Sequence, residues 1–191
     1  YTIVTAPPPS SGVIVCEILN IVNHYPLRKF GPYSSQSVHA NVEAMRYAYA
    51  DRNHYLGDPN FINNPVKKLK SLEYANTIYK KIKPNIAGSS KQMGSISVQE
   101  NANTTHYSIV DGKGNAVATT FTINGYFGNG MIAGNTGFFL NNELDDFAIK
   151  AGVPNMFQLV QGKANLIAPN KRPLSSMSPT IVLKNNKVFM V

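Results

Sequence analysis

The chain has 191 residues, of which 43% are apolar, and a formal net charge of +8. This length suits one domain with a sizeable core, and no apolar run approaches the roughly 18 residues that a membrane-spanning helix needs. The positive charge does not indicate a nucleic-acid interface, because the lysines between residues 67 and 83 spread along a predicted helical region, as on a solvated surface. Cys16 is the single cysteine, which excludes an internal disulfide and a cysteine metal site.

The first part of the chain predicts helices. Residues 1–12 are expected to be extended and to end in a proline-rich turn, since three consecutive prolines forbid a helix. Apolar residues at helical spacing predict a helix from about residue 15 that Pro26 stops. Longer helices are expected over residues 35–54 and 71–82. The expected apolar stripe of the 35–54 helix consists of Val38, Val42, Met45 and Tyr49, and Ser34 or Ser35 is its expected N-cap.

The second part of the chain predicts strands. Residues 84–103 are small, polar and aperiodic, which indicates a loop. Strands are expected over residues 105–111, 115–124, 137–140, 179–184 and 187–191. The last two form a hairpin around Asn185 and Asn186, residues that tolerate the left-handed region. Helices followed by strands predict the α+β class and a single domain.

Thr104 begins the most informative stretch. It is followed by two runs rich in β-branched and aromatic residues, with a glycine-containing turn at 111–115 between them. Cleavage of the chain before Thr104 would expose both its hydroxyl and its α-amine, whose ordinary pKa is roughly 8. The hydroxyl would then be a nucleophile with a base on the same residue, which is one form of acyl-transfer catalyst.

The run from Thr104 to Gly128 resembles the start of the small subunit of the γ-glutamyltransferases. These enzymes are N-terminal-nucleophile hydrolases that cut themselves before that threonine. Three further blocks of the chain resemble the same family, at residues 6–12, 140–147 and 169–180. The resemblance covers essentially the whole chain and implies a four-layer αββα sandwich, of which this chain is a part.

The resemblance also implies a division of the chain at the cleavage site. Residues 1–103 correspond to the C-terminal part of the large subunit, and residues 104–191 to the N-terminal part of the small subunit, the two together forming one domain. In the family, the arginine that clamps the substrate carboxylate lies before residue 1 of this chain, and the glycine pair of the oxyanion hole lies after residue 191. We therefore expect an internal piece of a larger enzyme.

The resemblance assigns the chemistry to Thr104, assisted by Thr122. The Thr104 hydroxyl attacks the carbonyl of Asn103 and cleaves the chain between these residues. It then attacks the γ-carbonyl of glutathione or another γ-glutamyl compound, and the γ-glutamyl ester passes to water or to an amino acid or peptide amine. Thr122 hydrogen-bonds and orients Thr104. The mechanism needs neither a metal nor an organic cofactor.

The resemblance assigns substrate binding to two groups of residues. Asn124, Glu143 and Asp146 offer oxygen acceptors for the three hydrogens of an α-ammonium group. Ser175 and Ser176 donate hydroxyl hydrogens to the α-carboxylate. On spacing alone, the carboxylates around Glu143 are more typical of a solvated turn, and the resemblance is what favours the binding role. Arg172 lies just before the serines, and we expect it to be structural.

The loop at residues 151–158 resembles the lid of the bacterial members of the family. Those members often have tyrosine where this chain has Phe157, and the tyrosine hydroxyl bonds the residue that matches Asn124. Phenylalanine cannot make that bond, so the lid closes by packing alone or is looser. The resemblance to bacterial members implies a periplasmic or secreted protein.

Two alternatives remain open at this point. A glutaryl or cephalosporin acylase of the same superfamily would use Thr104 in the same way on a substrate without an amino-acid head group. A catalytically inactive relative would have a binding or structural role. Glu143, Asp146 and the serine pair together favour the amino-acid head group, and an intact Thr104 favours an enzyme.

Overall fold

The computed structural model describes residues 1–90, 103–156 and 158–191. Most of the loop expected over residues 84–103, and Phe157 of the expected lid, lie outside the described residues. The elements, in chain order, are β1 (Thr2–Thr5), α1 (Gly12–Val22), α2 (Leu27–Phe30), α3 (Ser35–Tyr55), α4 (Val66–Leu69), α5 (Leu72–Tyr79), β2 (Thr104–Val110), β3 (Ala116–Thr122), the 3-10 helices η2 (Glu143–Asp146) and η3 (Lys163–Asn165), β4 (Thr180–Lys184) and β5 (Lys187–Met190).

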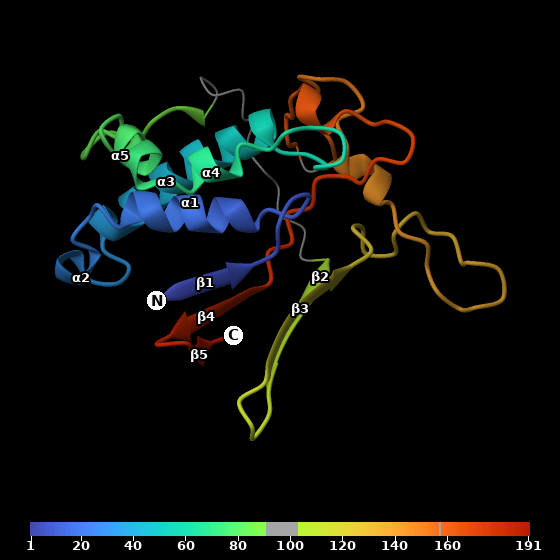
Figure 1. The fold of residues 1–191 in the computed structure, drawn as a ribbon. Helices are drawn as coiled ribbons and strands as arrows, with labels where there is room; N and C mark the ends of the chain where they lie inside the picture. Colours follow the sequence, from blue (N-terminus) through green and yellow to red (C-terminus); the bar gives the residue numbers. More distant parts are fainter. Residues whose placement is uncertain (91–102, 157) are drawn as a thin grey trace.

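The helices form one layer beside an antiparallel sheet (Figure 1). The sheet has the strand order β1-β4-β5, so the first and last strands of the chain lie in the same sheet. Strands β2 and β3 form a separate two-stranded hairpin, which extends away from the helices. The predicted α+β class is confirmed. No helix among the described residues is long and apolar enough to cross a membrane.

The core lies between α1, α3 and α5. One buried cluster contains Val13, Ile14, Ala48, Leu56, Leu69 and Leu174, and the other contains Ile21, Val22, Ala44, Ala75, Ile78 and Ile82. Helix α3 contributes only alanines to these clusters, and small side chains let helix axes approach closely. The Ser34 hydroxyl caps α3 by accepting a hydrogen bond from the backbone N–H of Ser37, as the sequence predicted.

The expected apolar stripe of α3 is not its buried face. Val38, Val42 and Met45 are exposed in this structure, whereas Ala40, Ala44 and Ala48 are fully buried. The two sets lie on different sides of the same helix. Of the expected stripe, only Tyr49 is half-buried and packs against the core. The prediction that the larger apolar residues form the buried face of α3 is therefore wrong, because close packing against α1 favours the smallest apolar residues.

Both predicted hairpins are confirmed, and two of the predicted strands differ from the structure. Strand β3 ends at Thr122 because Asn124 takes a left-handed conformation, with φ of 72°. The strand expected over residues 137–140 is absent: the described segment has only a single bridge between Ile132 and Phe139. Gly137 has φ of 79°, which a continuous strand cannot accommodate.

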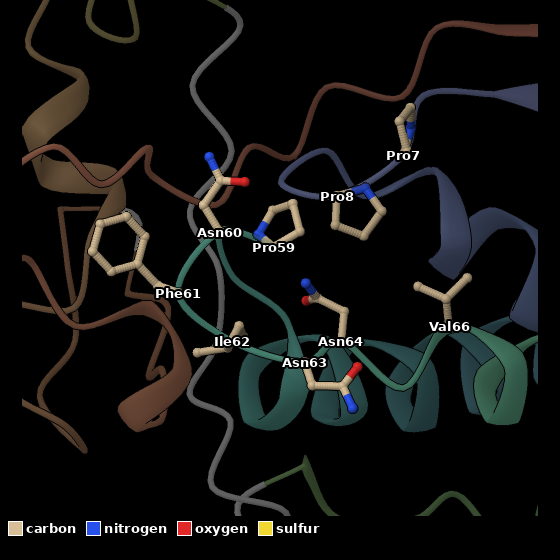
Figure 2. A pocket seen from close by; sticks show the side chains of 9 residues that line it. All are labelled: Pro7, Pro8, Pro59, Asn60, Phe61, Ile62, Asn63, Asn64 and Val66. Carbon is tan, nitrogen blue, oxygen red and sulfur yellow. The ribbon is translucent and has the colours of Figure 1, made fainter.

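An open hollow with a volume of about 730 Å³ borders the helical layer (Figure 2). Its lining residues come from the proline-rich turn after β1 and from the segment between α3 and α4: Pro7, Pro8, Pro59, Asn60, Phe61, Ile62, Asn63, Asn64 and Val66. The hollow contains none of the residues that the sequence assigns to catalysis or substrate binding.

Glu17 is an ionisable residue inside the helical core. Its side chain is fully buried in α1, and neither carboxylate oxygen has a hydrogen-bond donor among the described residues. Burial, followed by the negative charge of Asp51, raises the pKa of Glu17 to about 9. Asp51 in turn accepts a hydrogen bond of 2.7 Å from the hydroxyl of Tyr74. Glu17 is therefore neutral in the folded protein at pH 7, whereas it ionises in the unfolded chain.

We predict that Glu17→Gln flattens the pH dependence of stability in the full-length protein. The native pKa lies above the ordinary value of 4.5, so the stability contributed by neutral Glu17 is complete below about pH 4.5 and is lost as the pH rises through about 9. Melting temperatures measured from pH 5 to pH 9 should fall less steeply for Glu17→Gln than for wild type. Glu73→Gln, at an exposed position of α5, is the control; parallel curves for wild type and Glu17→Gln would contradict the prediction.

Candidate active site

Thr104 and Thr122 lie directly opposite each other on β2 and β3. They are partners in the antiparallel register of the hairpin, and antiparallel partners point their side chains to the same face. The Thr104 hydroxyl donates a hydrogen bond of 3.1 Å to the Thr122 hydroxyl. The predicted nucleophile and its predicted orienting residue are therefore in contact.

The Thr122 hydroxyl contacts both groups that a self-cleavage reaction would join. Besides accepting from Thr104, it donates a hydrogen bond of 3.3 Å to the carbonyl oxygen of Asn103, the residue before the predicted cleavage site. It also accepts a bond of 3.0 Å from the backbone N–H of Asn124. A hydroxyl has one hydrogen and two lone pairs, so these three bonds use all of its capacity and fix its orientation.

Asn142 connects the hairpin to the acidic segment. Its carbonyl oxygen accepts from the Asn124 side-chain amide at 3.3 Å, and its side-chain oxygen accepts from the backbone N–H of Gly125 at 2.7 Å. Asn142 immediately precedes η2, which begins with Glu143. Two predicted ligands of the ammonium group, Asn124 and Glu143, are thereby held on neighbouring segments. The sequence analysis did not identify this role of Asn142.

Glu143 and Asp146 occupy the two ends of η2. Burial raises the pKa of Glu143. Burial, and next the negative charge of Glu143, raise the pKa of Asp146 to about 6, while the positive charge of Arg52 acts in the opposite direction. A pair of partly buried carboxylates that repel each other in this way is suited to a cation, which would relieve the repulsion.

Ser175 and Ser176 are joined to the helical layer through Arg52, which is 1% exposed. The Arg52 guanidinium donates bonds of 2.8 Å to the Ser176 hydroxyl and of 2.8 Å to the Ser11 hydroxyl. Ser11 in turn donates to the carbonyl oxygen of Ser175 at 2.6 Å. No local pattern in the sequence indicated that Arg52 contacts a segment 124 residues away.

Asn165 joins the serine segment to the acidic segment. Its fully buried side chain accepts from the backbone N–H of Leu174 at 3.0 Å and donates to the carbonyl oxygen of Asp146 at 2.6 Å. It also bonds the side chain of Gln161, which itself donates to Asp146. Asp146 and the serine pair are thus fixed relative to one another by side chains that the sequence analysis did not single out.

Arg172 is engaged away from the predicted carboxylate site. Its guanidinium and its backbone N–H all bond the buried carboxylate of Asp58, at 2.7 to 3.1 Å. These bonds hold the pKa of Asp58 well below its usual range. Arg172 therefore anchors the segment before the serines, as the sequence analysis expected.

The expected lid is described except at Phe157. Asp145, which is not among the predicted ligands of the ammonium group, accepts a bond of 2.9 Å from the backbone N–H of Met156. The Asn142 side chain contacts the sulfur of Met156 at 3.5 Å. The loop is therefore fastened to the acidic segment at the residue before Phe157, which lies outside the described residues.

The comparisons with known proteins identify first the fold and then the family. The structure is similar to the cephalosporin acylase from Bacillus halodurans, with a TM-score of 0.74 and 25% identity over 97% of this chain and 31% of that one. The fold is therefore that of the N-terminal-nucleophile hydrolases. The family model for gamma-glutamyltranspeptidase matches residues 1–191, and the chain belongs to that family.

Curated relatives agree with this assignment. The chain is 54% identical to the glutathione hydrolase proenzyme of Pseudomonas sp. (strain A14) and 48% identical to that of Escherichia coli (strain K12), in each case over 100% of this chain. The aligned regions cover 34% and 33% of those two proteins. The chain thus spans about one third of the length of the curated relatives that it matches.

We predict that Asn165→Ala destabilises the full-length protein. The change leaves the N–H of Leu174 and the side-chain oxygen of Gln161 without their partner in a buried place, which costs about 1–3 kcal/mol for each unsatisfied group. The melting temperature should fall by a few degrees, as measured by differential scanning fluorimetry. Asn63→Ala, at an exposed position, is the control, and an equal change in both variants would refute the role assigned to Asn165.

Proposed function

We propose that this chain carries the cleavage site and most of the substrate head-group site of a γ-glutamyltransferase that also hydrolyses glutathione. The observation that carries the proposal is the position of the Thr122 hydroxyl between the Thr104 hydroxyl and the Asn103 carbonyl. By donating to that carbonyl, Thr122 polarises the bond that Thr104 attacks. By accepting from Thr104, it holds the nucleophile on the same side of the chain.

Self-cleavage follows as an intramolecular acyl shift. The Thr104 oxygen attacks the carbonyl carbon of Asn103, its proton passes to the departing Thr104 nitrogen, and the peptide bond becomes an ester. Water then hydrolyses the ester, which gives Asn103 a carboxylate and Thr104 a free hydroxyl and a free amine. Residues 1–103 become the end of the large subunit, and residues 104–191 the beginning of the small one. The relatives named as proenzymes support this division.

The same hydroxyl then transfers the γ-glutamyl group. The new amine of Thr104 accepts the hydroxyl proton, the oxygen attacks the γ-carbonyl of glutathione or a related compound, and the leaving amine takes up the proton. The resulting γ-glutamyl ester is attacked by water or by the amine of an amino acid or peptide. Both reactions are acyl transfers to one oxygen, so a single nucleophile serves for both.

The head group of the substrate is bound by opposite charges and by hydroxyl donors. The ammonium group lies against Asn124, Glu143 and Asp146, and its positive charge relieves the repulsion between the two carboxylates. The carboxylate lies against Ser175 and Ser176. We keep a periplasmic or secreted location as a proposal from the family resemblance.

We predict that Thr104→Ala abolishes cleavage of the full-length precursor. Intact mass and N-terminal sequencing of the wild type after incubation at neutral pH should give two fragments, the smaller beginning Thr104-Thr105-His106. Thr122→Ala should slow cleavage by roughly 100-fold, because one polarising donor is lost, whereas Thr122→Ser should restore most of the rate. Thr105→Ala is the matched control and should cleave normally. An uncut wild-type chain would overturn the proposal.

A cephalosporin or glutaryl acylase is the second candidate, and the structural similarity to the acylase from Bacillus halodurans favours it. Such an enzyme would use Thr104 identically. Its glutaryl substrate has a carboxylate but no α-ammonium group, so Glu143 and Asp146 would remain unneutralised beside it. That uncompensated repulsion is the physical reason to prefer a γ-glutamyl substrate.

We predict a strong preference for γ-glutamyl-p-nitroanilide over glutaryl-p-nitroanilide in the cleaved full-length enzyme. The kcat/KM ratio should be about 100 or more in favour of the γ-glutamyl compound, since the missing ammonium leaves buried charges unpaired. Asp146→Asn should reduce this ratio, and Asp145→Asn should leave it closer to the wild-type value. Equal kcat/KM values for the two substrates would instead support the acylase.

A further inference from the structure

Arg52 is a buried cation without a carboxylate partner. Its guanidinium bonds only neutral acceptors: the Ser11 hydroxyl, the Ser176 hydroxyl and, at 3.2 Å, the side-chain oxygen of Asn53. No carboxylate of the described residues forms an ion pair with it. A buried charge is normally compensated by a group of the opposite sign. The carboxylate of Asp146 interacts electrostatically with this guanidinium but forms no ion pair with it, so the guanidinium favours a further anion close to it.

The hydrogen bonds of Arg52 determine where the serine hydroxyls can donate. A serine hydroxyl has a single hydrogen, and the Ser176 oxygen already accepts from Arg52. The Ser176 hydrogen must therefore point away from the guanidinium, toward the exposed side of the residue. The described residues provide no acceptor for it. A hydroxyl whose oxygen accepts from a cation, and whose hydrogen has no acceptor in the protein, is suited to donate that hydrogen to an anion.

The second arm of Arg52 reaches Ser175 through Ser11. The Ser11 hydroxyl accepts a hydrogen bond from Arg52 and donates one to the backbone carbonyl of Ser175. The backbone N–H of Ser175 donates to the carbonyl of Pro9 at 2.8 Å. The Ser175 hydroxyl accepts from the backbone N–H of Met177 at 3.2 Å, so its hydrogen is also available. One guanidinium thus positions both serines.

We propose that Arg52 is a positioning residue that orients the Ser175–Ser176 hydroxyls and supplies the buried positive charge behind them, so that the pair binds the α-carboxylate of a γ-glutamyl substrate. Arg52 touches the serines and not the substrate. The proposal rests on the proposed function, because it assigns the serine pair to that carboxylate.

The same charge acts on the ammonium side of the site. The charged groups around Asp146 are Glu143 and Asp145 from its own 3-10 helix and Arg52 from α3, and only Arg52 lowers its pKa, which stands at about 6. Removal of the guanidinium therefore raises the pKa of Asp146. Since Asp146 must be ionised to bind an ammonium group, the acid limb of kcat/KM moves to higher pH. A residue that only supported the fold would not shift this limb.

The test uses the full-length protein and the variants Arg52→Met, Arg52→Lys, Ser176→Ala and the double variant Arg52→Met/Ser176→Ala. Arg28→Met, at an exposed position of α2, is the control. Cleavage before Thr104 is measured first, and then KM, kcat and the pH profile with γ-glutamyl-p-nitroanilide.

We expect Arg52→Met to raise KM by about 10- to 100-fold with a much smaller change in kcat, as for the loss of charge-assisted hydrogen bonds. Arg52→Lys should raise KM less, because lysine keeps the charge but cannot bond the Ser11 and Ser176 hydroxyls together as the guanidinium does. Adding Ser176→Ala to Arg52→Met should have little further effect, since the two residues act as one unit. Only the variants with Arg52→Met should shift the acid limb upward.

The outcomes separate the two proposals. A wild type that does not cleave, or does not act on the γ-glutamyl substrate, overturns the proposed function. An active wild type with an unchanged KM in Arg52→Met, or with effects of Arg52→Met and Ser176→Ala that multiply independently, overturns the role of Arg52 alone. If Arg52→Met gives no cleaved protein, Arg52→Lys decides, and a KM within about twofold of wild type overturns the proposal.

Discussion

The antiparallel register of β2 against β3 is the constraint on which the candidate site depends. It puts Thr104 opposite Thr122, and a slip of one residue would turn every side chain of one strand to the other face. The turn that sets this register lies at the far end of the hairpin, where the Asp111 carboxylate accepts from the backbone N–H groups of Lys113 and Asn115. The nucleophile is therefore aligned by a turn at the opposite end of its own strand.

The head-group half of the site is organised differently. Between β3 and β4 the described chain has only two short 3-10 helices, so backbone ladders cannot position the side chains. Side chains perform this task by bonding main-chain atoms: the half-buried Asn142, the buried Asn165 and, through Ser11, the buried Arg52. Such networks are stable when every member is satisfied. The Asn165 side chain also connects the acidic segment to the segment that carries the serines.

Local patterns in the sequence predicted the elements whose causes are local. The cap at Ser34, the glycine turn of the first hairpin and the Asn185–Asn186 turn all depend on residues within a few positions. One error arose where packing between distant segments is decisive, since helix α3 buries its alanines because α1 lies against them. The other error concerned the segment at 137–140, which is irregular and begins with Gly137 in a left-handed conformation.

The sequence predicted the kind of chemistry through its resemblance to a family, because motifs of that family lie within short stretches of the chain. The resemblance predicted Thr104 as the nucleophile, and it predicted the carboxylates and the serine pair as a site for an amino-acid head group. Their environment followed from the three-dimensional packing alone. Burial and contacts between segments far apart in the chain determine three properties of the protein: the position of Arg52 behind the serines, the raised pKa of Asp146 and the neutral state of Glu17 in the core. Burial and long-range contacts are properties of the packed molecule. A local sequence pattern contains no information about the distance to residues outside its own element.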